Sequence, residues 1–233
     1  MNQPVVILCR PEIPENIGFT ARCLKGFGIE DLRLVGIAKP EPDSRAYWTA
    51  RSGSEVLDKA RCFATLPEAL ADCHHAFGFT RRVRERSQTL NDLGAINLPA
   101  EGRTALVFGP ESDGLSQEDV MRMTHLVRIP LADPELSLNL SHAVAIALYA
   151  LSGKPSQPAV LDPFYRPASL AESEAAMEQV LEVLDRNGFL AKGKKEAARR
   201  ENLRILWKRV QPSRGELDFL CGALKALSER ADA

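Results

Sequence analysis

Short apolar runs alternate with amphipathic segments through about the first 150 residues of the chain. The run at residues 4–9 (PVVILC) is β-rich and uncharged, which is typical of a strand inside a sheet. Similar runs predict strands at 32–35, 60–65, 76–80, 104–108 and 126–129. Helical spacing and turn residues predict intervening helices that begin near Pro14, Ser44, Pro67, Gln117 and Ser141. This alternation predicts an α/β domain with a mainly parallel sheet and helices on both faces.

The pattern changes after the last of these helices. Prolines become frequent and predict a semi-rigid linker. Beyond it, long amphipathic patterns predict helices at 169–187 and 194–210. Ser213 and Glu216 stand in capping-box positions and open a third helix. We therefore predict a domain at 1–152, a proline-rich linker at 153–168 and an all-helical extension at 169–233.

Composition narrows the function classes. The 233 residues carry a formal net charge of −1, so nucleic-acid binding must rely on local patches. Neither a membrane span of roughly 20 apolar residues nor a signal peptide is recognisable, so we expect a cytoplasmic protein. The five cysteines are widely spaced, and we expect reduced thiols and no metal site. The motifs G-x-G-x-x-G, G-x-x-x-x-G-K-[ST] and G-x-S-x-G are absent, which disfavours a Rossmann dehydrogenase, a P-loop NTPase or an α/β-hydrolase.

Polar loops follow four of the predicted strands. Ligand sites in parallel sheets form beyond the carboxyl ends of strands, so these loops are candidates for a site. They span residues 10–16, 79–87, 109–116 and 133–141. In the last loop, Ser137, Asn139 and Ser141 alternate with leucines. This alternation is too short for an edge strand and predicts a loop that presents polar groups before a buried helix.

Individual residues of these loops also have plain structural interpretations. Asn16 is suited to cap a helix, and Arg22, six residues later, to stand on a solvated face. Gly109 permits another group to approach the backbone closely. Glu111 and Asp113 also suit the entry of a helix, and for Asp113 we favour that interpretation.

Two basic stretches are candidate RNA contacts, although a charge run is more often a solvated face. The first, RRVRERS from Arg81, is dense in arginine, which suits bidentate phosphate contacts. The second spans residues 192–209 and includes Trp207, which we expect to pack against Leu203 and Leu206.

Three blocks of sequence resemble the motifs of one enzyme family. They read ENIGFTARCLKGFGI, ALVFGPESDGLSQE and VRIPLADPELSLNLSHAVAIALYAL. In order and separation they are similar to the three motifs of the SPOUT-class (SpoU/TrmH superfamily) RNA ribose 2′-O-methyltransferases. The helical extension, with NGFL, RRENLRILWKR and ELDFLCGALKAL, looks like that of the TrmJ branch.

The resemblance implies a fold, a reaction and partners. It implies a trefoil knot that contains residues 133–141, and a homodimer with the active site at the subunit interface. It implies S-adenosylmethionine-dependent methylation of a tRNA anticodon-loop ribose, with cytidine or uridine at position 32 as the expected target and no metal. The blocks do not encode the substrate, so ribosomal RNA methylation and a non-catalytic RNA-binding module stay open as alternatives.

The same comparison implies roles for individual residues. Catalytic and substrate-positioning roles fall on Asn16, Arg22, Glu111, Ser137 and Asn139. The S-adenosylmethionine site is expected to comprise Phe79, Thr80, Arg81, Gly109, Ile129, Leu136, Ser137 and Leu138. The expected RNA contacts are Arg82, Arg84, Arg86, Lys194, Lys195, Arg199 and Arg200.

A ribose 2′-hydroxyl must lose its proton as it attacks a methyl group, and no His or Lys of the blocks is well placed to take it. Family accounts often give this role to the counterpart of Arg22, helped by the substrate phosphate. Because an arginine normally stays protonated, we interpret Arg22 as a clamp for phosphate and developing alkoxide and leave the base open.

We expect some side chains of the loop at 137–141 to pack in the core and others to take part in the chemistry. We expect Leu138 and Leu140 to anchor it in the core, and Ser137 and Asn139 to face cofactor and ribose. Ser141 should cap the next helix. One departure from the TrmJ pattern is the absence of an Arg beside Glu111, which some members carry. Another is the loop after Phe77, which is heavier in arginine than a small-residue cofactor loop would require. Both are expected to affect the choice of tRNA and not the reaction type.

Overall fold

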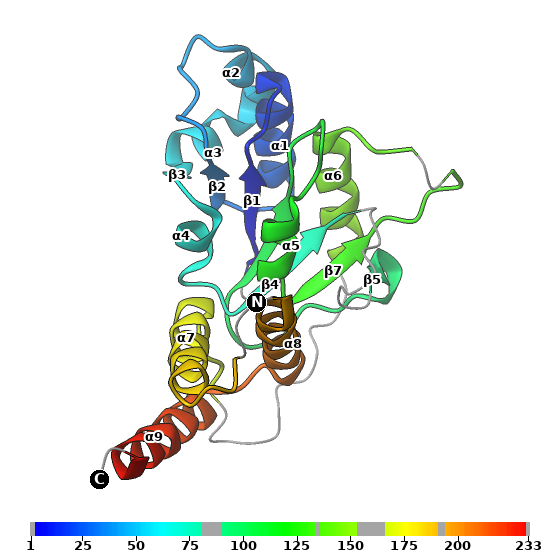
Figure 1. Ribbon diagram of the computed structural model, residues 1–233. Helices are drawn as coiled ribbons and strands as arrows, with labels where there is room; N and C mark the ends of the chain where they lie inside the picture. Colours follow the sequence, from blue (N-terminus) through cyan, green and yellow to red (C-terminus); the bar gives the residue numbers. More distant parts are fainter. Residues whose placement is uncertain (1–2, 81–89, 134–135, 153–165, 191–193, 232–233) are drawn as a thin grey trace. The chain divides into compact units, whose positions relative to one another are not determined.

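A computed structural model describes residues 3–80, 90–133, 136–152, 166–190 and 194–231 of the chain (Figure 1). The chain divides into two compact units, residues 1–159 and 160–233. Most of the predicted linker, 153–165, lies outside the described residues. None of the described helices is long and apolar enough to cross a membrane.

The first unit is built on a parallel sheet of seven described strands in the order β3-β2-β1-β6-β4-β7-β5. The strands are β1 (Val5–Cys9), β2 (Leu32–Val35), β3 (Arg61–Phe63), β4 (His75–Phe79), β5 (Leu90–Asp92), β6 (Thr104–Phe108) and β7 (His125–Arg128). The predicted α/β class and parallel sheet are confirmed. Strand β5 was not predicted, because its three residues, Leu-Asn-Asp, form no apolar run.

Helices cover both faces of this sheet (Figure 1). In chain order they are α1 (Pro14–Gly26), α2 (Arg45–Ala50), η1 (Arg51–Gly53), α3 (Ser54–Lys59), α4 (Leu66–Leu70), η2 (Leu93–Ala95), α5 (Gln117–Arg122) and α6 (Leu140–Leu151). Helix α3 was not predicted from the sequence; in the structure it buries Val56 and Leu57.

Side chains alternate between two cores, one on each face of the sheet. On one face, Leu8 and Phe108 belong to a cluster that includes Ile17 of α1 and Val144 of α6. On the other face, a Cβ at Gly78 of β4 would lie only 2.5 Å from Met123, which immediately follows α5. Only glycine fits there, so α5 packs directly on β4. The helices thereby fix the carboxyl ends of the central strands.

A buried charge network stands at the amino ends of the strands. Arg33 of β2 has a side chain only 1% exposed. It donates to the carboxylates of Asp31 and Asp72 and, over 2.6 Å, to the carbonyl oxygen of Ala69. Hydrogen bonding from Arg33 lowers the pKa of Asp72 to about 2. Because these partners precede β2 and β4, the network stabilises the end of the sheet opposite the polar loops.

The second unit comprises α7 (Leu170–Arg186), α8 (Lys194–Val210) and α9 (Arg214–Ala231). The predicted capping box is present: Ser213 N donates to Glu216 Oε2 over 2.7 Å, and Glu216 N to Ser213 Oγ over 3.3 Å. Trp207 packs in the same cluster as Leu203, as predicted. Leu206, however, is 44% exposed and belongs to neither described cluster that contains Trp207, so this part of the prediction is wrong.

Candidate functional site

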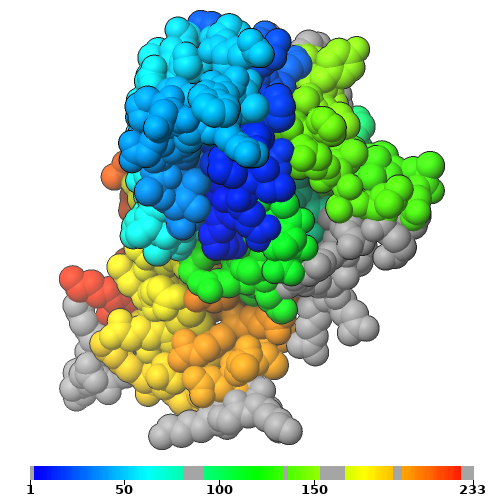
Figure 2. Space-filling model, turned by 90° about the horizontal axis from the view of Figure 1, so that it is seen from above, coloured from blue at the N-terminus to red at the C-terminus, as the bar shows by residue number. Residues whose placement is uncertain are grey.

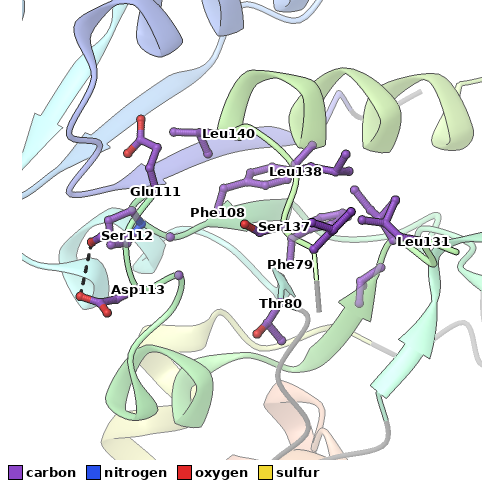
Figure 3. Close-up of a pocket in the computed structure, with 17 residues that line it drawn as sticks. Phe79, Thr80, Phe108, Glu111, Ser112, Asp113, Leu131, Ser137, Leu138 and Leu140 are labelled. Carbon is purple, nitrogen blue, oxygen red and sulfur yellow. Dashed lines mark hydrogen bonds between the residues drawn. The ribbon is translucent and has the colours of Figure 1, made fainter. Parts of the chain in front are cut away.

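A pocket opens at the carboxyl ends of β4, β6 and β7, lined by described residues of the loops that follow β6 and β7 (Figure 3). Its walls are largely apolar, and the rings of Phe79 and Phe108 stack within it at a centroid distance of 4.4 Å. Glu111, Asp113 and Ser137 add polar groups from two loops. An apolar cavity with a few convergent polar groups is typical of a small-molecule or cofactor site.

The pocket brings together nearly all residues predicted to bind a cofactor. Those that line it are Phe79, Thr80, Gly109, Ile129, Leu136, Ser137 and Leu138. Arg81 lies outside the described residues, as do Arg82, Arg84 and Arg86 of the predicted RNA contacts. The pocket also contains residues that the sequence analysis did not select, including Phe108 and Val127, whose strand positions had suggested only core packing.

A chain of hydrogen bonds joins the three motif blocks beside this pocket. Glu111 accepts from Asn16 Nδ2 over 2.6 Å and from the backbone N of Glu12 over 2.9 Å. The amide oxygen of Asn16 accepts in turn from Asn139 Nδ2 over 2.8 Å. Asn16 is only 3% exposed, so its amide is committed to these partners. The chain therefore couples the entry of α1 to the loop before α6.

The interpretation of Asn16 as a helix cap is wrong. The N-cap position of α1 belongs to Ile13, which offers no side-chain acceptor. Instead, the carboxylate of Glu111 accepts the backbone N–H groups of Glu12 and Ile13 just before the helix. A negative charge is favourable at a helix N-terminus, so the capping group comes from a distant loop.

Ser141 does not cap α6 as expected, because the helix begins one residue earlier, at Leu140. The cap is Asn139, whose Oδ1 accepts from Ser141 N over 2.9 Å and from Ser141 Oγ over 2.7 Å. Leu140 is buried as predicted, while Leu138 is half-buried and lines the pocket. Asn139 is thus tied to Asn16 and α6, and Ser137 is the polar residue of this loop that lines the pocket.

Two residues of the loop after β6 have structural explanations. A Cβ at Gly109 would lie 2.2 Å from the carbonyl carbon of Gly114, so the group that approaches its backbone is the same loop. Asp113 is not a helix-entry acid, which corrects the sequence interpretation. The cap of α5 is Ser116, whose capping-box partner is Asp119, and Asp113 stands in the pocket wall instead.

Arg22 stands apart from this arrangement. It is exposed on α1, does not line the pocket of its own chain, and has no ion pair with any residue in the described ranges. The interpretation of a solvated Arg fits its surroundings within one chain. A role in catalysis would need a second molecule to bring it to a pocket.

The predicted RNA contacts of α8 are partly engaged within the second unit. Arg199 lies over the ring of Phe189, with 5.1 Å between its guanidinium carbon and the ring centroid. Arg200 pairs with Glu196 over 3.1 Å. The side chains of Lys194 and Lys195 lie outside the described part of the structure.

One ion pair at this edge of the sheet was not predicted from the sequence. Arg10, directly after β1, has a left-handed backbone (φ 48°) and pairs with the buried carboxylate of Asp119. No local pattern indicates it, because the partners are 109 positions apart.

Comparison with known proteins identifies the first unit. It matches the model of the SpoU rRNA Methylase family over residues 3–149. The chain belongs to the SpoU methylase family. The matched SpoU region contains the whole pocket and the Glu111–Asn16–Asn139 chain.

Similar proteins cover the helical unit as well. The chain is 34% identical to a protein from Methanocaldococcus jannaschii named tRNA (cytidine-2′-O-)-methyltransferase TrmJ, over 88% of this chain and 89% of that protein. It is 30% identical to the tRNA (cytidine/uridine-2′-O-)-methyltransferase TrmJ of Yersinia pestis (strain Pestoides F), over 97% and 91%. The crystal structure of TrmJ from Z. mobilis ZM4 is similar with a TM-score of 0.83 and 31% identity, over 97% of this chain and 99% of that one. The predicted TrmJ-type resemblance is confirmed.

Proposed function

We propose that this protein is an S-adenosylmethionine-dependent tRNA ribose 2′-O-methyltransferase that acts on cytidine or uridine in the anticodon loop, at position 32. The observation that carries the proposal is the pocket. Residues of the second and third motif blocks line it, and the Glu111–Asn16–Asn139 chain of hydrogen bonds connects these blocks to the first. The names of the similar TrmJ proteins support the substrate class.

The residues of the pocket fit S-adenosylmethionine. Phe79, Ile129 and Leu138 offer apolar walls for an adenine ring and a thioether chain. Thr80 and Ser137 supply neutral hydrogen-bonding groups at the same cavity. When bound there, this cofactor supplies an electrophilic methyl group on a positively charged sulfur.

The chain's own residues must orient and activate the ribose hydroxyl. Neither His nor Lys occurs among the described residues that line the pocket, and its carboxylates belong to Asp113 and to Glu111, which already accepts hydrogen bonds from Asn16 and Glu12; no residue is assigned as the base. Arg22 would bind the neighbouring phosphate and stabilise the alkoxide as the proton leaves. Asn16 and Glu111 are engaged with each other over 2.6 Å, which supports a positioning role for both.

A homodimer would bring Arg22 to the chemistry. Since Arg22 does not line its own pocket, Arg22 of the partner subunit would reach it across a two-fold interface. Exposed apolar side chains on the adjacent helices α1 and α6 support such an interface: Phe19 is 46% exposed, Ile146 39% and Tyr149 76%. We also propose the knot of this family around residues 133–141, and a role in RNA binding or dimer support for the helical unit.

The test is methyl transfer from labelled S-adenosylmethionine to unmodified tRNA, with mapping of the modified ribose by mass spectrometry. Label at a pyrimidine of position 32 is expected. Label on ribosomal RNA only would favour the alternative substrate. RNA binding without cofactor binding or transfer, measured by calorimetry, would favour a non-catalytic module.

A further inference from the structure

Two arginines on the surface formed by α1, α2, η1 and α3 lack partners among the described residues. These elements contact one another and form a continuous blue-to-cyan surface in Figure 2. Lys25, Arg45 and Lys59 each pair with a glutamate there. Arg22 and Arg51 are exposed and have no ion pair in the described ranges. The other three basic side chains of this surface are thus each neutralised by a glutamate, whereas Arg22 and Arg51 are not neutralised by any described carboxylate.

The unpaired arginines belong to segments in direct contact. η1 begins at Arg51 and ends at Gly53, and a Cβ at Gly53 would lie 2.6 Å from Arg22 Cα. Only glycine allows η1 to lie this close to the backbone of α1. The two arginines therefore stand on segments whose backbones are in contact, and neither pairs with a carboxylate among the described residues.

The backbone at Arg51 is one that arginine disfavours. Its φ is 47° and its ψ −116°, a left-handed conformation in which glycine has no steric penalty. Arg10 has a similar φ of 48°, but the guanidinium of Arg10 is held by Asp119. Within the described ranges, no ion pair of this kind holds the guanidinium of Arg51. Strain of this kind concentrates at functional positions, so the charge itself is the feature to explain.

An exposed indole stands near the same charge. Trp48, three residues before Arg51, is 67% exposed. By contrast, Trp207 is half-buried and donates to Ser173 Oγ over 2.9 Å. Single-stranded RNA is commonly bound by aromatic rings that stack on bases and by arginines that contact phosphates. Trp48 and Arg51 supply both kinds of group within four residues of sequence.

We propose that the segment formed by α2 and η1 is an RNA contact: Arg51 binds a phosphate next to the one bound by Arg22, and Trp48 stacks on an unpaired base. This inference rests on the proposed function, since the RNA in question is the loop presented for methylation. The surface is distinct from both basic stretches predicted from the sequence.

The test compares two arginines of the same segment. A fluorescein-labelled tRNA anticodon stem-loop is titrated with the full chain, with Arg51→Gln and with the control Arg45→Gln. Arg51→Gln should weaken binding roughly threefold or more near 0.15 M salt, and make the slope of log K against log[salt] shallower by about 0.7 to 0.9. Arg45→Gln should change affinity less than about twofold, because Arg45 is already paired with Glu15.

The variant Arg51→Gly tests whether weaker RNA binding could result from a folding defect. Glycine relieves the left-handed backbone, so Tm should be unchanged or about 2 to 4 °C higher while RNA binding weakens as in Arg51→Gln. Affinity for S-adenosylmethionine should equal that of the wild type in all three variants. Wild-type RNA affinity and salt slope in both Arg51 variants would overturn the phosphate contact.

Tryptophan emission tests the stacking. Unlabelled stem-loop RNA should quench the emission of the wild-type chain, and Trp48→Leu should lose most of this quenching, since Trp207 is half-buried in the helical unit. Quenching of wild-type amplitude in Trp48→Leu would overturn it. If the wild type binds this RNA but methylates none, the proposed function fails while the contact is still judged by these variants.

Discussion

At the scale of single residues, Asn16 is where three distant segments meet. Its amide nitrogen donates to Glu111 and its oxygen accepts from Asn139, residues 95 and 123 positions away. A side chain with a donor and an acceptor on one planar group satisfies both neighbours at once. A carboxylate in its place would repel Glu111, and a hydroxyl would be too short to span them.

We expect Asn16→Ala to lower the free energy of unfolding by about 1 to 3 kcal/mol, since it leaves Glu111 and Asn139 without this partner. Affinity for S-adenosylmethionine should fall as well, because the loop before α6 loses a tie. Urea denaturation and calorimetry measure the two effects. The control is Asn187→Ala, which removes an exposed hydrogen bond to Val183 O. Equal stability losses in both variants would contradict the special position of Asn16.

Gly109 provides a second prediction. Alanine there would bring its Cβ to within 2.2 Å of Gly114, so Gly109→Ala should cost at least about 1 to 3 kcal/mol and distort the pocket. Gly26→Ala, where a Cβ meets nothing within 4 Å, should be neutral or stabilising. Thermal unfolding with and without S-adenosylmethionine compares the two. A Gly109→Ala variant that binds the cofactor normally would show that the loop adapts.

At the scale of elements, the strands and their carboxyl-end loops could be predicted from local pattern. Apolar runs located six of the strands, and the rule for parallel sheets located the pocket. The cofactor residues came from the resemblance, not from pattern. Two predictions about helix caps were wrong. Asn139, not Ser141, caps α6, and Glu111, from another loop, accepts the backbone N–H groups at the start of α1. The first is a local shift of a helix boundary between two residues that can both cap a helix. The second depends on a residue about a hundred positions away, which periodicity does not encode.

Strand β4 carries a buried titratable group that should make stability depend on pH. Burial, with the nearby His125, lowers the pKa of His75 from 6.5 to about 4. The unfolded chain therefore binds a proton between these values that the folded chain does not. Neutral His75 therefore contributes up to about 3 kcal/mol to the free energy of unfolding. This contribution is fully present above about pH 6.5 and should be lost as the pH falls towards 4.

The measurement is urea unfolding between pH 4 and 7 for the wild type, His75→Gln and the exposed-site control His142→Gln. His75→Gln should be less stable at pH 7 but show a shallower decline with falling pH. In the folded chain Asp72 has a pKa of about 2 and stays ionised throughout this pH range. Its contribution to the free energy of unfolding is therefore constant near pH 7. Parallel pH curves for the wild type and His75→Gln would contradict the prediction.

At the scale of the whole molecule, the proposed dimer makes each active site a joint product of two chains. Arg22→Ala and a pocket variant such as Leu138→Asp should each be inactive alone. Mixed under conditions that allow subunit exchange, half of the dimers carry one chain of each kind, and one of their two sites is intact. Methylation should then return to about a quarter of the wild-type rate.

Light scattering should confirm dimers in all of these samples, and mass spectrometry of the intact dimers should show that mixed dimers have formed. A mixture without recovery, despite proven exchange, would place Arg22 and the pocket on the same chain. The same result would remove the main reason to assign Arg22 a role across the interface.

The strand order has a consequence for how the protein is made. β1 lies between β2 and β6, and its pairing with β6 joins Val5 to Ala105, a hundred positions further along. A nascent chain on the ribosome therefore holds one edge of β1 open until β6 has emerged. The pocket is completed later still, because its lining residues extend to Ala143, beyond β6. Synthesis itself thus keeps incomplete chains from binding cofactor.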